Sequence, residues 1–238
     1  LVSHVPYFVI RAATYGINII SVRPEPGLVS VAVENRQIVL IDPKQGVDYF
    51  QFDGLPHIQS GVIDDQSVAL ARLESLVTEM DGSDRLFKES RTNNLAGYNI
   101  KAAESDRLPV IWLVHDEFAE WMIEDYKASF YLVARLGVKA RAAGIYLIFA
   151  AQRPYANIMP MQLRSNLGNR LILRVDSEGT SEIALGEKGA ECLLGKGHLL
   201  ANLEGLHLCY AQVPFVDQTF MDELVRITIE GRDIDLSA

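Results

Sequence analysis

The chain alternates between short apolar runs and stretches with helical periodicity. Four runs are mostly apolar and have the length of strands: residues 38–41, 110–114, 145–151 and 170–175. An uninterrupted apolar run of this length, unlike one that alternates with polar residues, predicts a strand that is buried on both faces.

Helical signals lie between these runs. Residues 66–80 follow Asp65, a good helix cap, and they present one apolar face, which consists of Ala69, Leu73, Leu76, Val77 and Met80. A second helical stretch follows the run 110–114, breaks near Glu124, resumes at about Ser129 and ends at Gly144. Buried strands that alternate with helices predict an α/β fold with a parallel sheet flanked by helices.

The first 37 residues have a different pattern. Residues 17–22 and 28–33 are short runs rich in β-branched residues, and the turn sequence Pro24-Glu25-Pro26-Gly27 separates them. We therefore predict a small β-rich N-terminal segment over residues 1–37, followed by one α/β domain over residues 38–238.

Composition narrows the class of protein. Hydrophobic residues make up 49% of the 238 residues, which excludes a disordered tail or a disulfide-stapled miniprotein. The formal net charge of −9 argues against a wholly basic nucleic-acid coat, although it allows a local basic channel. No apolar run reaches the roughly 18 residues of a membrane helix. We expect a cytoplasmic domain, with any membrane anchor in regions outside this chain.

The second apolar run ends in His115-Asp116-Glu117. Four apolar residues followed by Asp-Glu is the Walker B arrangement of ATP-hydrolysing P-loop enzymes, in which the aspartate holds Mg²⁺ and the glutamate polarises the attacking water. On these residues alone, the alternative is an acidic cap at the start of the next helix.

The third run ends in Gln152-Arg153-Pro154. A glutamine at the tip of the strand next to Walker B can contact the γ-phosphate or orient the attacking water. The alternative is a polar residue that opens a loop before proline. Asp116 and Gln152 follow successive predicted strands at matching ends, and this agreement favours the functional interpretation.

Six stretches resemble, in order, the motor domain of the FtsK/SpoIIIE family of DNA translocases, within the RecA-like ATPases. They are Ile41-Asp42-Pro43-Lys44, Gly54-Leu55-Pro56-His57-Ile58, Asp116-Glu117-Phe118-Ala119, Ala140-Arg141-Ala142-Ala143-Gly144-Ile145, Ala151-Gln152-Arg153-Pro154, and Gly189-Ala190-Glu191 with Leu193-Leu194-Gly195. The resemblance covers about residues 38–200, and residues 1–37 also resemble the β-rich segment that precedes the motor in that family.

The resemblance implies a RecA-like core that uses ATP and Mg²⁺, assembles as a ring, in most cases a hexamer, and moves along double-stranded DNA. Asp116 would bind the nucleotide's Mg²⁺ and Glu117 would be the catalytic base. Gln152 would contact the γ-phosphate, and Arg170 would reach the nucleotide of the neighbouring subunit.

The family's DNA-binding loops follow Walker B, and the basic residues nearest to that position here are Lys127, Arg135 and Lys139. A translocating motor needs contacts to phosphates rather than to bases, so a few such residues repeated around a ring can suffice. The alternative is a helix with a solvated basic face.

One departure from the family pattern is large. The family places a phosphate-binding Walker A loop, Gly-x-x-x-x-Gly-Lys-Ser/Thr, before the Asp-Pro-Lys strand, whereas here Gln37 runs directly into Ile38. Gly195-Lys196-Gly197 is no substitute, because the upstream glycine position is Ala190 and no hydroxyl residue follows the lysine. We hypothesise that a segment is omitted at Gln37/Ile38; the alternative is a true deletion.

The function predicted is therefore an ATP-driven translocase acting on double-stranded DNA. Two alternatives remain open. A related secretion or conjugative coupling ATPase, which moves protein or nucleoprotein, shares this pattern of strands. A catalytically inactive binding module is the third interpretation, and the missing phosphate loop is its best support.

Overall fold

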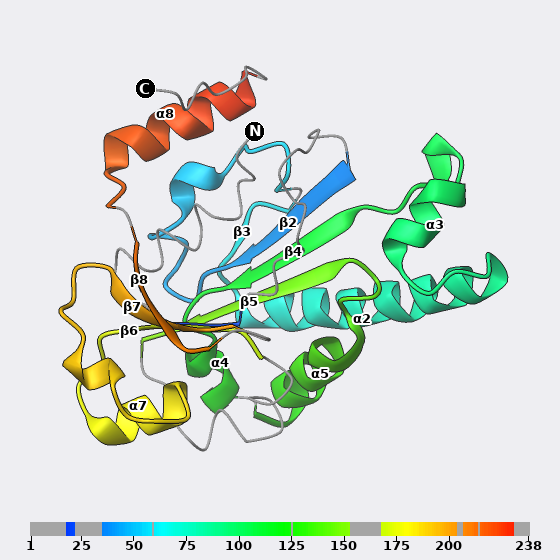
Figure 1. Ribbon diagram of the computed structural model, residues 1–238. Helices are drawn as coiled ribbons and strands as arrows, with labels where there is room; N and C mark the ends of the chain where they lie inside the picture. Colours follow the sequence, from blue (N-terminus) through cyan, green and yellow to red (C-terminus); the bar gives the residue numbers. More distant parts are fainter. Residues whose placement is uncertain are drawn as a thin grey trace.

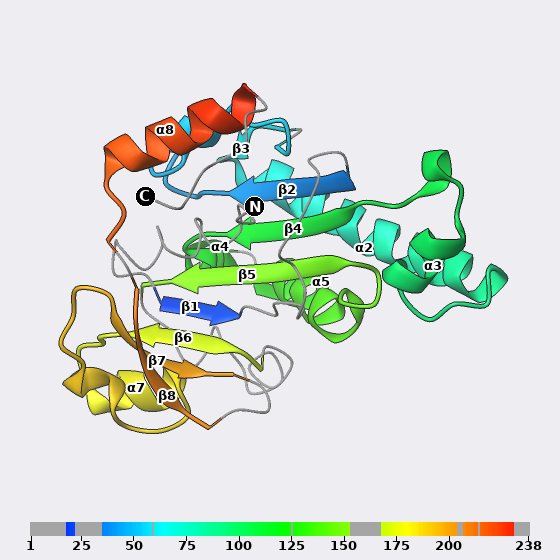
Figure 2. The same ribbon diagram turned by 45° about the horizontal axis from the view of Figure 1, so that its top comes forward.

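The computed structural model describes residues 18–21, 35–58, 60–124, 126–152, 168–203, 207–213 and 215–230. Within this part of the chain, eight strands form one sheet (Figures 1 and 2). In spatial order they are β3 (Val62–Ile63), β2 (Arg36–Ile41), β4 (Val110–His115), β5 (Ile145–Ala151), β1 (Asn18–Ser21), β6 (Arg170–Leu173), β7 (His198–Asn202) and β8 (Cys209–Gln212).

The sheet has a parallel half and an antiparallel half. Strands β3, β2, β4 and β5 pair in parallel, with Ile41 opposite His115 and His115 opposite Phe149. Strand β1 pairs antiparallel with both β5 and β6, and β6, β7 and β8 continue antiparallel. The carboxyl ends of β2, β4 and β5 therefore lie at the same edge.

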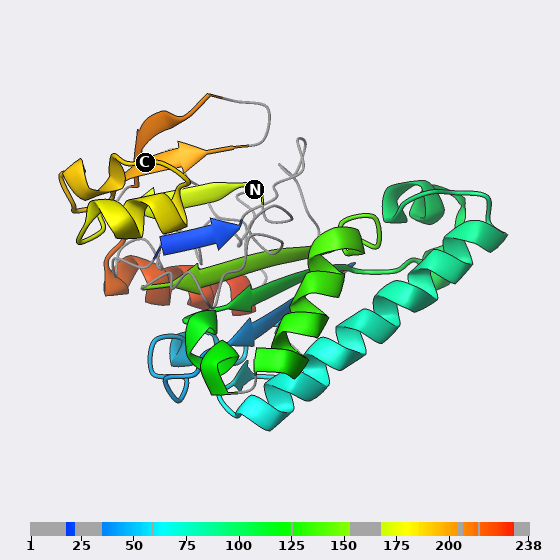
Figure 3. The same ribbon diagram turned by 90° about the horizontal axis from the view of Figure 1, so that it is seen from below.

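Helices cover both faces of the parallel half (Figures 1 and 3). On one face lie α2 (Gln66–Glu89), α4 (Phe118–Glu124) and α5 (Tyr126–Lys139); on the other lies α8 (Gln218–Ile229) with the short 3-10 helix η2 (Phe50–Phe52). The smaller elements are α3 (Leu95–Lys101), η3 (Glu104–Asp106), α7 (Glu178–Ala184) and η4 (Ala190–Cys192).

Alternate residues of β2 show how the two faces are filled. Val39 and Ile41 pack into the cluster that includes α2 and α5, while Ile38 and Leu40 pack into the cluster that includes Leu224 of α8. Both clusters are almost fully shielded from solvent, which confirms the predicted α/β fold with a parallel sheet flanked by helices.

Helix α2 is nine residues longer than predicted. Its start is as expected, since the Asp65 carboxylate accepts a hydrogen bond from the Val68 N–H at 3.0 Å. The predicted end at Met80 was wrong because Asp81, Gly82 and Asp84 break the apolar pattern, yet Ser83 and Phe87 extend the buried face to Glu89. Packing against the sheet outweighs these weaker helix formers.

Most of the predicted β-rich segment, including the run 28–33, lies outside the described residues. Its described strand, β1, is part of the main sheet between β5 and β6 (Figure 2). Gln37 and Ile38 are consecutive residues of β2, opposite Ile111 and Trp112. The division of the chain at residue 37 stays a prediction.

Candidate nucleotide and metal site

Three polar residues follow the ends of adjacent parallel strands. Asp42 follows β2, Asp116 follows β4 and Gln152 follows β5. The backbone N–H of Asp116 donates to the Ile41 carbonyl at 2.9 Å, so the ends of β2 and β4 are tied together. In open α/β sheets this carboxyl edge is where ligands bind.

Asp116 is fully buried, and its two carboxylate oxygens have different surroundings. Oδ1 accepts a hydrogen bond from the Glu117 N–H at 2.9 Å. Oδ2 has no hydrogen-bond partner in the part of the chain that the structure describes. Burial raises the pKa of Asp116 to about 6, against the opposing effect of Lys44. A buried carboxylate oxygen without a donor is suited to binding a cation.

Glu117 has a backbone conformation that few residues other than glycine adopt, with φ of 39°. Its carboxylate accepts hydrogen bonds from the Gln152 N–H, with distances of 3.1 and 3.3 Å to the two oxygens. Burial raises the pKa of Glu117, and the Gln152 N–H opposes this effect. The strained turn and this contact hold Glu117 across the ends of β4 and β5.

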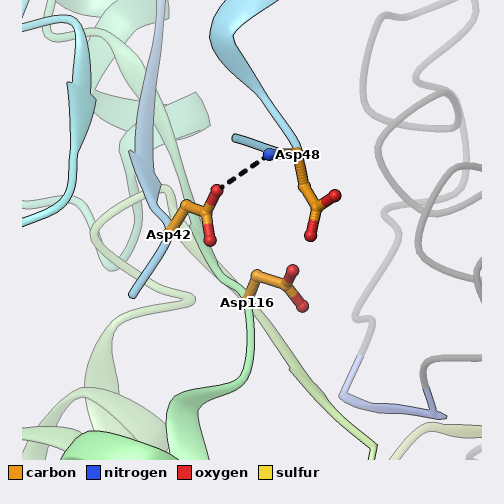
Figure 4. A group of neighbouring side chains, drawn as sticks. All are labelled: Asp42, Asp48 and Asp116. Atoms are coloured by element: carbon orange, nitrogen blue, oxygen red, sulfur yellow. Dashed lines mark hydrogen bonds between the residues drawn. The ribbon is translucent and has the colours of Figure 1, made fainter. Parts of the chain in front are cut away.

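Asp42, Asp48 and Asp116 form an acidic cluster at this edge (Figure 4). One carboxylate oxygen from each lies within 4.8 Å of the other two. Asp42 is fully buried and accepts from the backbone N–H groups of Lys44 and Asp48 at 3.0 and 3.3 Å. The Lys44 ammonium lies 3.7 Å from Asp48. Oxygen donors of this kind fit a hard divalent cation such as Mg²⁺.

The residue before Asp116 is part of the core rather than of the site. His115 is buried among Phe118, Trp121 and Phe149, with ring centroids 5.6–6.4 Å away. Burial lowers its pKa to about 3, so the imidazole stays neutral at physiological pH. This aromatic packing fixes the end of β4.

The structure brings together Asp116, Glu117 and Gln152 but not Arg170. The Arg170 guanidinium donates to the carbonyls of Ala184 and Leu185, at 3.3 and 3.1 Å, where α7 ends. Within a single chain it therefore stabilises the C-terminus of α7. The role predicted for Arg170, contact with the nucleotide of a neighbouring subunit, stays a prediction.

The three predicted DNA contacts lie on α5. Lys127 and Lys139 are exposed, whereas Arg135 pairs with Asp81 of α2, and its Nη2 donates to both carboxylate oxygens at 2.9 Å. Its guanidinium also lies 5.8 Å from the centre of the Tyr131 ring. Arg135 thus joins α5 to α2. Of the three predicted DNA contacts, only Lys127 and Lys139 have no ion-pair partner among the described residues.

Sequence reasoning missed Asp42 and Asp48 as members of the site. A signal for Asp42 was present, because it follows a buried apolar run just as Asp116 does. Asp48 carried no signal, since only the fold of the loop between β2 and η2 returns it to the strand end.

The chain is similar in sequence to proteins of one family. The family model described as FtsK/SpoIIIE family matches residues 28–156. "DNA translocase FtsK 2" of Neisseria meningitidis is 35% identical over 194 residues, which is 73% of this chain and 19% of that protein. "DNA translocase FtsK" of Campylobacter jejuni is 32% identical over 202 residues, 84% of this chain and 21% of that protein. The chain thus spans about a fifth of the length of these relatives.

Two solved structures share the fold. The pCW3 conjugation coupling protein TcpA, in a monomer form with ATPγS, aligns with a TM-score of 0.70 at 28% identity, over 82% of this chain and 57% of that one. The cytoplasmic domain of the type VII secretion ATPase EccC from Thermomonospora curvata aligns with a TM-score of 0.68 at 22% identity, over 83% of this chain and 24% of that one.

The parallel strands β3, β2, β4 and β5 flanked by helices, together with these structural neighbours, define a RecA-like P-loop ATPase fold. Within that class, the chain belongs to the FtsK/SpoIIIE family. No described helix combines the length and the apolar character needed to cross a membrane.

Proposed function

We propose that this chain is the motor domain of an ATP-driven translocase that acts on double-stranded DNA as a ring-shaped assembly. The observation that carries the proposal is the contact between Glu117 and the backbone of Gln152, beside the buried, half-unpaired carboxylate of Asp116. An acidic helix cap, the alternative interpretation of Asp116-Glu117, has no need of a glutamate held across to the next strand.

Each residue of this edge has a step to perform. Asp116 would bind the Mg²⁺ that accompanies ATP and neutralises phosphate charge. Glu117 would accept a proton from the attacking water, and its raised pKa brings it nearer to the pH at which a base works best. The exposed side chain of Gln152 would contact the γ-phosphate. Because its own backbone binds Glu117, Gln152 can link phosphate contact to the position of the base.

The subunit and DNA contacts are further parts of the proposal. For Arg170 to reach the neighbouring nucleotide, it must release the α7 carbonyls, which would couple hydrolysis to movement of α7. Lys127 and Lys139 would bind DNA phosphates, and Arg135 would position α5 through Asp81.

ATP hydrolysis with and without double-stranded DNA tests the proposal. With the segment hypothesised between Gln37 and Ile38 present, we expect DNA to stimulate turnover by the wild-type protein and Glu117→Gln to reduce that turnover by about 100-fold or more, since general base catalysis is lost. Glu120→Gln is the matched control, because Glu120 is an exposed glutamate one turn along the chain. Equal turnover in both variants would contradict the role of Glu117. ATP turnover by the wild-type protein that double-stranded DNA does not stimulate would contradict a motor that acts on double-stranded DNA.

A conjugative coupling or secretion ATPase is the second candidate, favoured by the structural likeness to TcpA and EccC. The same assay separates the first candidate from a motor for protein substrates, which hydrolyses ATP without stimulation by double-stranded DNA.

A further inference from the structure

We infer that Asp42 and Asp48 are ligands of the same divalent cation as Asp116, so that the end of β2 and the loop after it complete a three-carboxylate site. This deepens the proposed function, which assigns the cation to Asp116 alone.

The first argument is the buried, unpaired oxygen of Asp116. In Figure 4 the carboxyl groups of Asp116 and Asp48 point toward each other, and Asp42 lies beside them. Asp116 Oδ2 is inaccessible to solvent and no described donor reaches it. A cation between the three carboxylates supplies the missing partner.

The second argument is charge. Three carboxylates place one oxygen each within 4.8 Å, and two of the residues, Asp42 and Asp116, are fully buried. Lys44 is the cation nearest to the cluster in the described chain, and it lies 3.7 Å from Asp48 on the partly exposed side. One ammonium charge leaves at least two negative charges unbalanced, since Glu117 also lies next to Asp116, and a divalent cation would reduce the repulsion between them.

The third argument is the way the backbone holds the donors. The N–H groups of Lys44 and Asp48 bind both oxygens of Asp42 and so fix the loop that carries Asp48 against the strand end. Among the described residues, Lys44 is the ion-pair partner of the Asp48 carboxylate, at 3.7 Å, and no described N–H donates a hydrogen bond to that carboxylate. The site has its donors placed before the ion arrives.

Binding of Mn²⁺ to the nucleotide-free 238-residue chain, followed by electron paramagnetic resonance, tests the inference. We expect saturable binding to one tight site, weakened by about tenfold or more in Asp48→Asn. Asp64→Asn is the matched control, because it removes an exposed aspartate with the same charge, and wild-type affinity is expected there. Asp42→Asn should weaken binding as well; circular dichroism shows whether it folds, because Asp42 also binds two backbone N–H groups.

Wild-type Mn²⁺ affinity in folded Asp48→Asn, or an equal loss in Asp64→Asn, would overturn the inference. Because no nucleotide or DNA is present, this result is separate from the proposed function. ATP turnover without a Mn²⁺ site would support the proposed function and contradict the inference. A Mn²⁺ site without ATP turnover would support the inference and contradict the proposed function.

Discussion

At the scale of single residues, the site is built at a cost to stability. Asp116 buries a carboxylate beside Asp42 and Glu117, which raises its pKa to about 6 from 3.8. In EDTA at pH 7.5 we expect Asp116→Asn to stabilise the fold by about 1–3 kcal/mol, because the neutral amide avoids the burial of charge. Unfolding in urea measures this difference.

The pH dependence of that difference follows from the sign of the shift. The folded-state pKa of Asp116 lies above the unfolded value, so the destabilisation is absent below about pH 4, grows as the pH rises and is complete above about pH 6. The gap between wild type and Asp116→Asn should therefore shrink from pH 7.5 to pH 4.5. A constant gap would contradict the assignment of the effect to charge burial.

At the scale of elements, one glycine decides how α5 passes into β5. Gly144 has φ of +75°, and a Cβ there would lie 2.1 Å from Leu95 Cδ2. Its carbonyl also accepts from the Ile111 N–H at 2.9 Å, at the start of β4. We expect Gly144→Ala to lower the free energy of unfolding by about 2–4 kcal/mol, through backbone strain and overpacking.

Gly82→Ala is the control for this prediction. Gly82 lies inside α2, and a methyl group added to its Cα would meet nothing within 4 Å, so alanine should stabilise the helix by about 0.5–1 kcal/mol. In urea unfolding, the changes in the free energy of unfolding of the two variants should have opposite signs. A Gly144→Ala variant that is more stable than wild type would show that the junction between α5 and β5 can accommodate a Cβ.

Secondary-structure elements were predictable from the sequence where an uninterrupted apolar run determined them. Strand β5 matches its predicted run at both ends because every residue from Ile145 to Ala151 is buried. The placement of Asp116, Glu117 and Gln152 at one edge of the sheet was predictable for a related reason, since these residues follow the ends of such runs. Their roles stay predictions. The position of Asp48 depends on how the loop after β2 folds back to the strand end, and the Arg135–Asp81 ion pair depends on how α5 packs against α2. No local sequence pattern contains that information.

At the scale of the whole molecule, the junction between Gln37 and Ile38 decides whether this edge can process a nucleotide. The sequence supplies the proposed cation ligand Asp116 and the proposed base Glu117 but no phosphate-binding loop, and β2 pairs with β4 on both sides of the junction. A segment inserted here would make Ile38 the first residue of β2 and release Arg36 and Gln37 from Val110 and Ile111.

Trypsin digestion of the protein purified from its natural source tests the junction directly. Cleavage after Arg36 and Lys44 gives a peptide of residues 37–44 if Gln37 is bonded directly to Ile38. We expect this peptide to be missing, because the proposed base and the proposed cation site have no use without bound phosphates. Its detection by mass spectrometry would establish a true deletion and would contradict the proposed motor function. The chain would then be a member of the family that binds a partner without hydrolysing ATP.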